Sequence, residues 1–91
     1  MRLRWSTPAE ADLIRLHRFL APKNRRVATN LLRTLRAGAL PLIGHPRLGE
    51  RIDSIEEHEV RRIFVGSYEL RYQVTSDAIT VLRIWHTREN R

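Results

Sequence analysis

The apolar residues of this chain change their spacing once, and that change restricts the possible folds more than any other feature. From Ala9 to Leu35 they recur every three or four residues, which is typical of helices with one buried face. From Val60 to Trp85 they tend to alternate with polar residues, as in strands that bury one face of a sheet. The sequence therefore predicts a helical half followed by a sheet half.

Capping and breaking residues divide the helical half into two helices. Thr7 can cap the first helix, and Pro8 can occupy its first position, where a missing N–H costs nothing. Pro22 ends this helix, because the residue before a proline disfavours helical geometry. A second helix is expected from around Asn24 to Gly38. The two helices should form a hairpin, since only a few residues join them.

Four strands are expected around the two helices. They lie in the stretches RLRWS at the start and EVRRIFVG, SYELRYQVT and AITVLRIWH in the second half. The intervening GALPLIGHPRLGER is predicted to be a connection without regular structure, because glycine and proline interrupt it. The order β-α-α-β-β-β predicts one α+β domain over residues 1–91, with the helical hairpin on one face of a small, mainly antiparallel sheet.

The composition points to an acidic partner. The formal net charge is +7, and all of the 17 basic residues except Lys23 are arginine. Arginine makes planar, forked contacts with phosphate and carboxylate groups. Arginine content also follows genomic base composition, so the charge alone names no partner.

Several classes of protein are excluded or disfavoured. The chain has no cysteine, which excludes disulfides and thiolate zinc sites, and its four histidines are scattered singly, so we expect no metal site and no cofactor. No apolar run approaches the roughly 20 residues that cross a bilayer, and the first ten residues do not resemble a signal peptide. We therefore expect a cytoplasmic protein with no membrane partner.

The register of the last hairpin decides which side chains share a face. A two-residue turn at Ser76 and Asp77 would pair Val74 with Ile79, Tyr72 with Val81 and Tyr68 with Trp85. That register turns the aromatic residues towards the helices. The other face then holds Glu69, Arg71, Leu82, Ile84 and His86, a half-apolar groove that suits an amphipathic partner segment. A β-bulge would instead return Leu82 and Ile84 to the core.

Three short motifs resemble a known superfamily. They are P-x-x-G at Pro46 and Gly49, Y-x-x-x-Y at Tyr68 and Tyr72, and W-H-x-R at Trp85, His86 and Arg88. Together with the element order, they resemble the RelE/ParE toxins of type II toxin–antitoxin systems over nearly the whole chain, and are most similar to the ParE-like branch. The resemblance implies a cognate antitoxin with an acidic segment that folds onto the toxin. Its expected binding residues are those of the groove, namely Arg71, Leu82, Ile84 and His86.

The superfamily implies two alternative activities. ParE-like members block DNA gyrase without being known as nucleases, whereas RelE-like members cut messenger RNA on the ribosome without a metal. If this chain were a nuclease, its catalytic residues would be Arg62, Arg71, His86 and Arg88. Two basic positions of the nuclease pattern are replaced here by Val60 and Glu69, and a carboxylate would repel the scissile phosphate. A gyrase inhibitor with no catalytic residues is therefore our preferred interpretation.

Gyrase inhibition requires only an exposed binding surface. Its residues are expected at the helical hairpin and the chain end: Arg25, Arg26, Arg88 and Arg91. His86 is then most simply a residue that ends a strand. An inactive interaction module or a plain nucleic-acid-binding module is the third alternative, although exposed aromatic residues interleaved with the arginines are not evident in the sequence.

Overall fold

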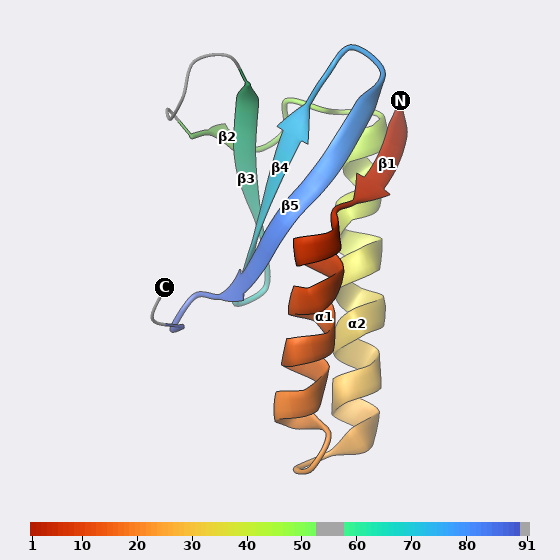
Figure 1. The fold of residues 1–91 in the computed structure, drawn as a ribbon, viewed down its shortest axis with the longest axis vertical. Coiled ribbons are helices and arrows are strands. Elements are labelled where there is room, and N and C mark those ends of the chain that lie inside the picture. Colours follow the sequence, from red (N-terminus) through yellow and green to blue (C-terminus); the bar gives the residue numbers. More distant parts are fainter. Residues whose placement is uncertain (53–57, 90–91) are drawn as a thin grey trace.

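The computed structural model describes residues 1–52 and 58–89, and it confirms the predicted α+β fold (Figure 1). The elements are β1 (Arg2–Trp5), α1 (Thr7–Leu20), α2 (Arg25–Ala39), the 3₁₀ helix η1 (Leu40–Ile43), β2 (Glu50–Arg51), β3 (Glu59–Val65), β4 (Tyr68–Val74) and β5 (Ala78–His86). The described strands form one sheet in the order β1-β5-β4-β3-β2, in which β1 runs parallel to β5 and the other pairs are antiparallel. No helix in this part of the chain is long and apolar enough to cross a bilayer.

Both helices begin at side-chain caps. The hydroxyl of Ser6, not of Thr7 as predicted, accepts a hydrogen bond from the N–H of Ala9 and caps α1. Asn24 caps α2 by accepting from the N–H of Val27, close to where the sequence places the start of the second helix. The connection after α2 was predicted to be irregular, and this is wrong in part, because it contains η1 and the two-residue strand β2.

The helical hairpin packs on one face of the sheet, and the core lies between the two layers. Figure 1 shows α1 and α2 side by side, with β5 passing the N-terminal part of α1 and then diverging from it. The fully buried large side chains include Leu13 and Leu35 of the helices and Leu70, Tyr72, Ile79, Val81 and Ile84 of the sheet. Each such side chain contributes about 1.5–3 kcal/mol when it leaves water. The opposite face of the sheet carries no helix among the described residues.

A β-bulge changes the register of the last hairpin. Tyr72 pairs with Val81 as predicted, but Arg71 pairs with Arg83, so that Leu82 is the extra residue. Beyond the bulge Ile84 turns into the core, where its exposure is 0%, and Trp85 turns to the face away from the helices. The predicted pair of Tyr68 with Trp85 is therefore wrong. The alternative with a bulge describes Ile84 correctly, while Leu82 is only half-buried.

The tyrosine of β4 ties two of the sequence motifs together. The Tyr72 hydroxyl accepts a hydrogen bond from the N–H of Gly49 at 2.9 Å and donates one to the carbonyl of Pro46 at 2.9 Å. Arg61 adds a hydrogen bond to the carbonyl of Gly49 at 2.7 Å. Burial is the main reason that the pKa of Tyr72 is raised, so its hydroxyl stays protonated. The P-x-x-G loop is thus fixed to the sheet by side chains.

Side chains also cover the edge of β5 that extends beyond β1. The Ser6 hydroxyl donates to the carbonyl of Leu82, and Asp12 accepts from the N–H of Ile84 at 2.8 Å. Arg15 donates to the carbonyl of Ile84 at 3.0 Å, while Glu89 accepts from the N–H of His86 at 2.7 Å. Each of these backbone groups would otherwise be available to a neighbouring strand.

We expect Gly49→Ala to destabilise the protein and Gly44→Ala to leave it unchanged. A Cβ at Gly49 would lie 2.4 Å from the carbonyl oxygen of Arg62, whereas a Cβ at Gly44 meets nothing within 4 Å. The free energy of unfolding, measured with urea, should fall by about 1–3 kcal/mol for Gly49→Ala. It should change by less than about 0.5 kcal/mol for Gly44→Ala. Equal stabilities of the two variants would contradict the close approach of this loop to β3.

Candidate functional site

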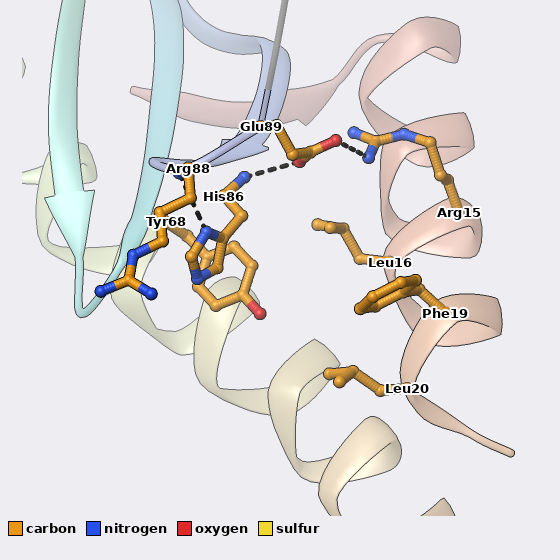
Figure 2. Close-up of a pocket in the computed structure, with 8 residues that line it drawn as sticks. All are labelled: Arg15, Leu16, Phe19, Leu20, Tyr68, His86, Arg88 and Glu89. Carbon is orange, nitrogen blue, oxygen red and sulfur yellow. Dashed lines mark hydrogen bonds and ion pairs between the residues drawn. The ribbon is translucent and has the colours of Figure 1, made fainter. Parts of the chain in front are cut away.

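An apolar groove lies between α1 and the C-terminal end of β5 (Figure 2). It has a volume of about 560 Å³ and is lined by Arg15, Leu16, Phe19, Leu20, Tyr68, His86, Arg88 and Glu89. In Figure 2 the apolar side chains of α1 point across it towards Tyr68 and His86. Phe19 is 66% exposed, which is unusual for a large aromatic side chain at the margin of a core. The groove therefore offers uncovered apolar surface between charged ends.

The C-terminal turn is held against α1 by Glu89. One carboxylate oxygen accepts from the N–H of His86 and the other pairs with Arg15 (Figure 2). The N–H of Arg88 donates to Nδ1 of His86 at 3.0 Å, and the His86 ring stands edge-on to Tyr68 with ring centroids 5.0 Å apart. Burial, followed by the Glu89 charge, raises the pKa of Tyr68, which keeps its hydroxyl neutral. His86 is thus fixed by the turn that it begins.

Asp12 anchors α1 to the bulged end of β5. Its side chain is 5% exposed, and the carboxylate accepts from Arg83 at 2.8 Å and 3.1 Å, from Arg15 at 3.2 Å and from the N–H of Ile84 at 2.8 Å. Burial alone would raise the pKa of Asp12, but these hydrogen bonds, with that of Arg83 the strongest, outweigh it and lower the pKa. The group therefore stays ionised inside the protein.

The face of the sheet away from the helices carries two rows of side chains at adjacent positions of β3, β4 and β5. The arginine row consists of Arg62, Arg71 and Arg83. The row beside it consists of two aromatic residues, Phe64 and Trp85, with Glu69 between them. The guanidinium carbons of Arg71 and Arg83 lie 4.8 Å and 5.1 Å from the centroid of the Trp85 ring. Arg62 lies 5.5 Å from that of Phe64. We call this surface the open face.

Glu69 is buried beneath the open face. Its side chain is only 1% exposed. It nevertheless lies on the side of the sheet that faces away from the helices and the hydrophobic core. It accepts a hydrogen bond from Arg71 at 2.8 Å, and a nitrogen of Arg62 lies 3.8 Å away. A buried carboxylate needs such cationic partners to remain charged. Glu69 thereby offsets the mutual repulsion of two neighbouring arginines.

The predicted nuclease residues do not converge. Arg62 and Arg71 lie on the open face, whereas His86 lies on the opposite side of the sheet against Tyr68. Arg88 is in the turn that follows β5. Glu69 lies beside Arg62 and Arg71, and its negative charge would repel a phosphate bound to these arginines. The expectation that the four residues meet in one site is therefore wrong.

The predicted antitoxin groove is also not formed as a single face. Ile84 is fully buried, Arg71 lies on the open face, and His86 lines the groove on the other side. The prediction that these residues share a face assumed that β5 is uninterrupted. The bulge at Leu82 changes which face each later residue of the strand occupies. The roles of Arg71, Leu82 and His86 in antitoxin binding stay predictions, while Ile84 in its buried position has no surface to offer.

The predicted target-binding residues fall at two places. Arg25 and Arg26 are exposed at the start of α2, at the tip of the hairpin, and Arg88 is exposed in the C-terminal turn. The groove separates these places, with Leu20 near the hairpin end and Arg88 at the other. Arg91 lies outside the described residues. In the described part of the chain, no three histidine or acidic side chains come together in a way that could hold a metal ion.

Several residues of the groove were missed by the sequence analysis. Arg15 and Phe19 lie on α1 beside the apolar stripe, one turn apart, and Glu89 follows β5.

A signal for the buried Asp12 exists in the sequence, because this carboxylate falls three residues after Ala9 and directly before Leu13, inside the apolar stripe of the helix. A charged residue in such a stripe indicates a buried ionic contact.

Comparison with solved structures identifies the class of fold. The chain has the fold of a toxin from a ParDE pair: it is similar to the structure described as "Chromosomal ParDE TA system from P. aeruginosa", with a TM-score of 0.75 and 19% sequence identity. The match covers 94% of this chain and 95% of that chain. None of the curated proteins compared matches the sequence.

The family model identifies the chain more closely than the fold does. The model described as "ParE toxin of type II toxin-antitoxin system, parDE" matches residues 3–91. The chain therefore belongs to the ParE toxin family, which confirms the resemblance that its motifs indicated.

We expect Asp12→Asn to remove a pH-dependent part of the stability. A carboxyl group whose pKa is lowered by folding stabilises the protein above its unfolded pKa, and this contribution disappears as the pH falls from about 4 through the folded value. At pH 7 the variant should lose about 1.5–3 kcal/mol of unfolding free energy, the usual contribution of hydrogen bonds to a charged group. Its stability should also vary less with pH between about 2 and 5.

Glu10→Gln is the matched control for Asp12→Asn. Glu10 pairs with Arg36 at 2.9 Å, but both side chains are nearly half exposed. Such a surface pair contributes less than about 1 kcal/mol. Urea denaturation of the two variants at pH 7 and pH 3 compares them directly. If Asp12→Asn cost no more than Glu10→Gln, the buried anchor would not have the importance that we assign to it.

Proposed function

We propose that this toxin arrests growth by binding DNA gyrase and has no nuclease activity of its own. The family supports a type II toxin. The observation that favours binding over catalysis is the distribution of the nuclease candidates over two faces of the sheet, with Glu69 buried next to Arg62 and Arg71. Metal-free RNA cleavage needs an acid, a base and phosphate-binding cations around one phosphate. This arrangement does not supply them together.

The gyrase-binding surface is proposed to include exposed arginines at both ends of the groove. Arg25 and Arg26 project from the first turn of α2, where the helix dipole disfavours cations. No acidic residue in that turn offsets them. Arg88 extends the basic surface at the C-terminal turn, and Arg91 follows it in the sequence. Cations kept at an unfavourable helix end are better explained by a partner than by folding.

The groove is the proposed docking site of the cognate antitoxin. Its floor is apolar, from Leu16, Phe19 and Leu20, and Arg15 and Arg88 stand at its margin. An acidic amphipathic segment matches both features, since its apolar side chains would cover the floor while its carboxylates reach the arginines. His86, which the sequence analysis assigned to antitoxin binding, keeps this role in the proposal because its ring forms part of the wall.

Gyrase inhibition is tested by supercoiling assays with toxin that has been purified free of antitoxin. We expect His86→Ala to inhibit as the wild type does, and the double variant Arg25→Glu/Arg26→Glu to need roughly tenfold more protein, equivalent to about 1.4 kcal/mol of lost binding. Arg33→Glu, an exposed arginine on the same helix, is the control and should change little. Cleavage of messenger RNA on programmed ribosomes that stops in His86→Ala would reverse this conclusion.

Antitoxin docking is tested at Phe19 on α1. Phe19→Glu should weaken binding of the cognate antitoxin by at least about tenfold in calorimetry, because it places a charge on the apolar floor. Ile14→Glu is the matched control, since Ile14 is 53% exposed on the same helix and does not line the groove. In cells, antitoxin expression should rescue growth from the control variant but not from Phe19→Glu. Equal binding by the two variants would place the antitoxin elsewhere.

A further inference from the structure

The arginine row of the open face is arranged at a cost to the fold. Arg62, Arg71 and Arg83 occupy directly neighbouring positions on three strands. Like charges in such positions destabilise a sheet. Two buried carboxylates, Glu69 beneath the row and Asp12 at its end, compensate for part of this repulsion. Arg83 contributes to the fold as a partner of Asp12, whereas apolar or alternating charged residues at the positions of Arg62, Glu69 and Arg71 would build the same sheet.

The open face carries an excess of positive charge. Arg2 and Arg4 of β1 alternate with Leu3 and Trp5, which pack towards the core, so both arginines point to the side away from the helices. With the arginine row they place five guanidinium groups there. Three carboxylates of the described residues pair with the arginine row, namely the exposed Glu50 with Arg62, the buried Glu69 with Arg71 and the buried Asp12 with Arg83, so two of the five positive charges remain in excess.

The face also offers planar surfaces, which distinguish it from a site for a protein segment. Trp85 is half-buried between the guanidinium groups of Arg71 and Arg83, and Phe64 is 55% exposed beside Arg62. Aliphatic side chains are scarce: the next positions across the strands are Val60, Gln73 and Thr80. Unpaired bases stack on aromatic rings and guanidinium planes, while phosphates bind arginine forks. The apolar groove on the other side fits a peptide better.

We propose that the open face binds a single strand of DNA without cutting it. The strand's phosphates would follow the arginine row, and its unpaired bases would stack beside Trp85 and Phe64. The planar groups indicate a single strand and not a duplex. The bases of a duplex stack on one another, so they have no free faces along its length. The assignment to DNA rests on the proposed function, since gyrase is an enzyme that holds and opens DNA. The toxin would then contact both its protein target and the nucleic acid on which that target acts.

Fluorescence anisotropy of labelled oligonucleotides tests the proposal without gyrase. We expect the full chain to bind a 15-nucleotide oligo(dT) several-fold more tightly than a 15-base-pair duplex. The logarithm of the affinity should fall with the logarithm of the salt concentration with a slope of about −2, corresponding to three phosphate contacts at about −0.7 each on a single strand. Tighter binding to the duplex would overturn the proposal, and tenfold tighter binding to oligo(U) would overturn the assignment to DNA.

Two pairs of variants locate the site. Arg4→Glu reverses an exposed charge on the open face, and Arg18→Glu makes the same change on α1, where that side chain is exposed. Only the first should weaken binding and reduce the salt slope. Arg71→Lys retains a positive charge next to Glu69 but loses the plane over Trp85, so affinity for oligo(dT) should fall several-fold with an unchanged slope. Arg33→Lys is its control. Equal effects within either pair would overturn the proposal.

Failure of this inference can be separated from failure of the proposed function. If oligo(dT) binding is absent while the toxin still inhibits supercoiling, the open face has no such role and gyrase binding stands. If oligo(dT) binding is present and depends on Arg4, while supercoiling is unaffected by the toxin, the DNA site stands as a property of the chain and the gyrase proposal is wrong. Circular dichroism melting of each variant confirms that the fold is retained.

Discussion

The buried carboxylate of Asp12 determines how the two sides of this protein are organised. It stands in the apolar stripe of α1 and accepts the N–H of Ile84, just beyond the bulge of β5. A buried charge is costly unless it has several donors, and Arg83 and Arg15 provide the others. The contact therefore fixes the bulged strand end against the helix. From this follow the burial of Ile84, the outward position of Trp85 and the place of Arg15 beside the groove.

The same contact explains why the element order could be predicted and the faces could not. Periodicity and helix-ending residues are local signals, and they located both helices and the three long strands correctly. A bulge depends on a partner distant in the chain, here Asp12, which lies 72 residues before Ile84. The alternating pattern beyond Val81 therefore assigned the side chains of β5 to the wrong faces of the sheet. The position of a carboxylate within the stripe of α1 was the available clue.

The sequence patterns around the candidate sites also report local structure better than tertiary packing. The motif residues Pro46, Gly49 and Tyr72 turned out to form one hydrogen-bonded tie, so their pattern marks the fold rather than a reaction. His86 ends its strand and begins the next turn. Groove residues such as Phe19 could not be predicted from the sequence. The exposure of an aromatic side chain depends on how the helices pack, and its neighbours in the sequence do not reveal that packing. The helices cover one face of the sheet only, and two surfaces of different chemistry result.

The side chains that cover the outer edge of β5 limit how the sheet can grow. Ser6, Asp12, Arg15 and Glu89 occupy backbone donors and acceptors that a further strand would need. Two copies of the chain therefore cannot join through this edge, which removes one common route to fibrous aggregates. The opposite edge differs, since β2 pairs with β3 only at Arg61 and Arg62 within the described strands. Extension of the sheet by another polypeptide is therefore blocked along this part of β5 and left to the edge strands β1 and β2.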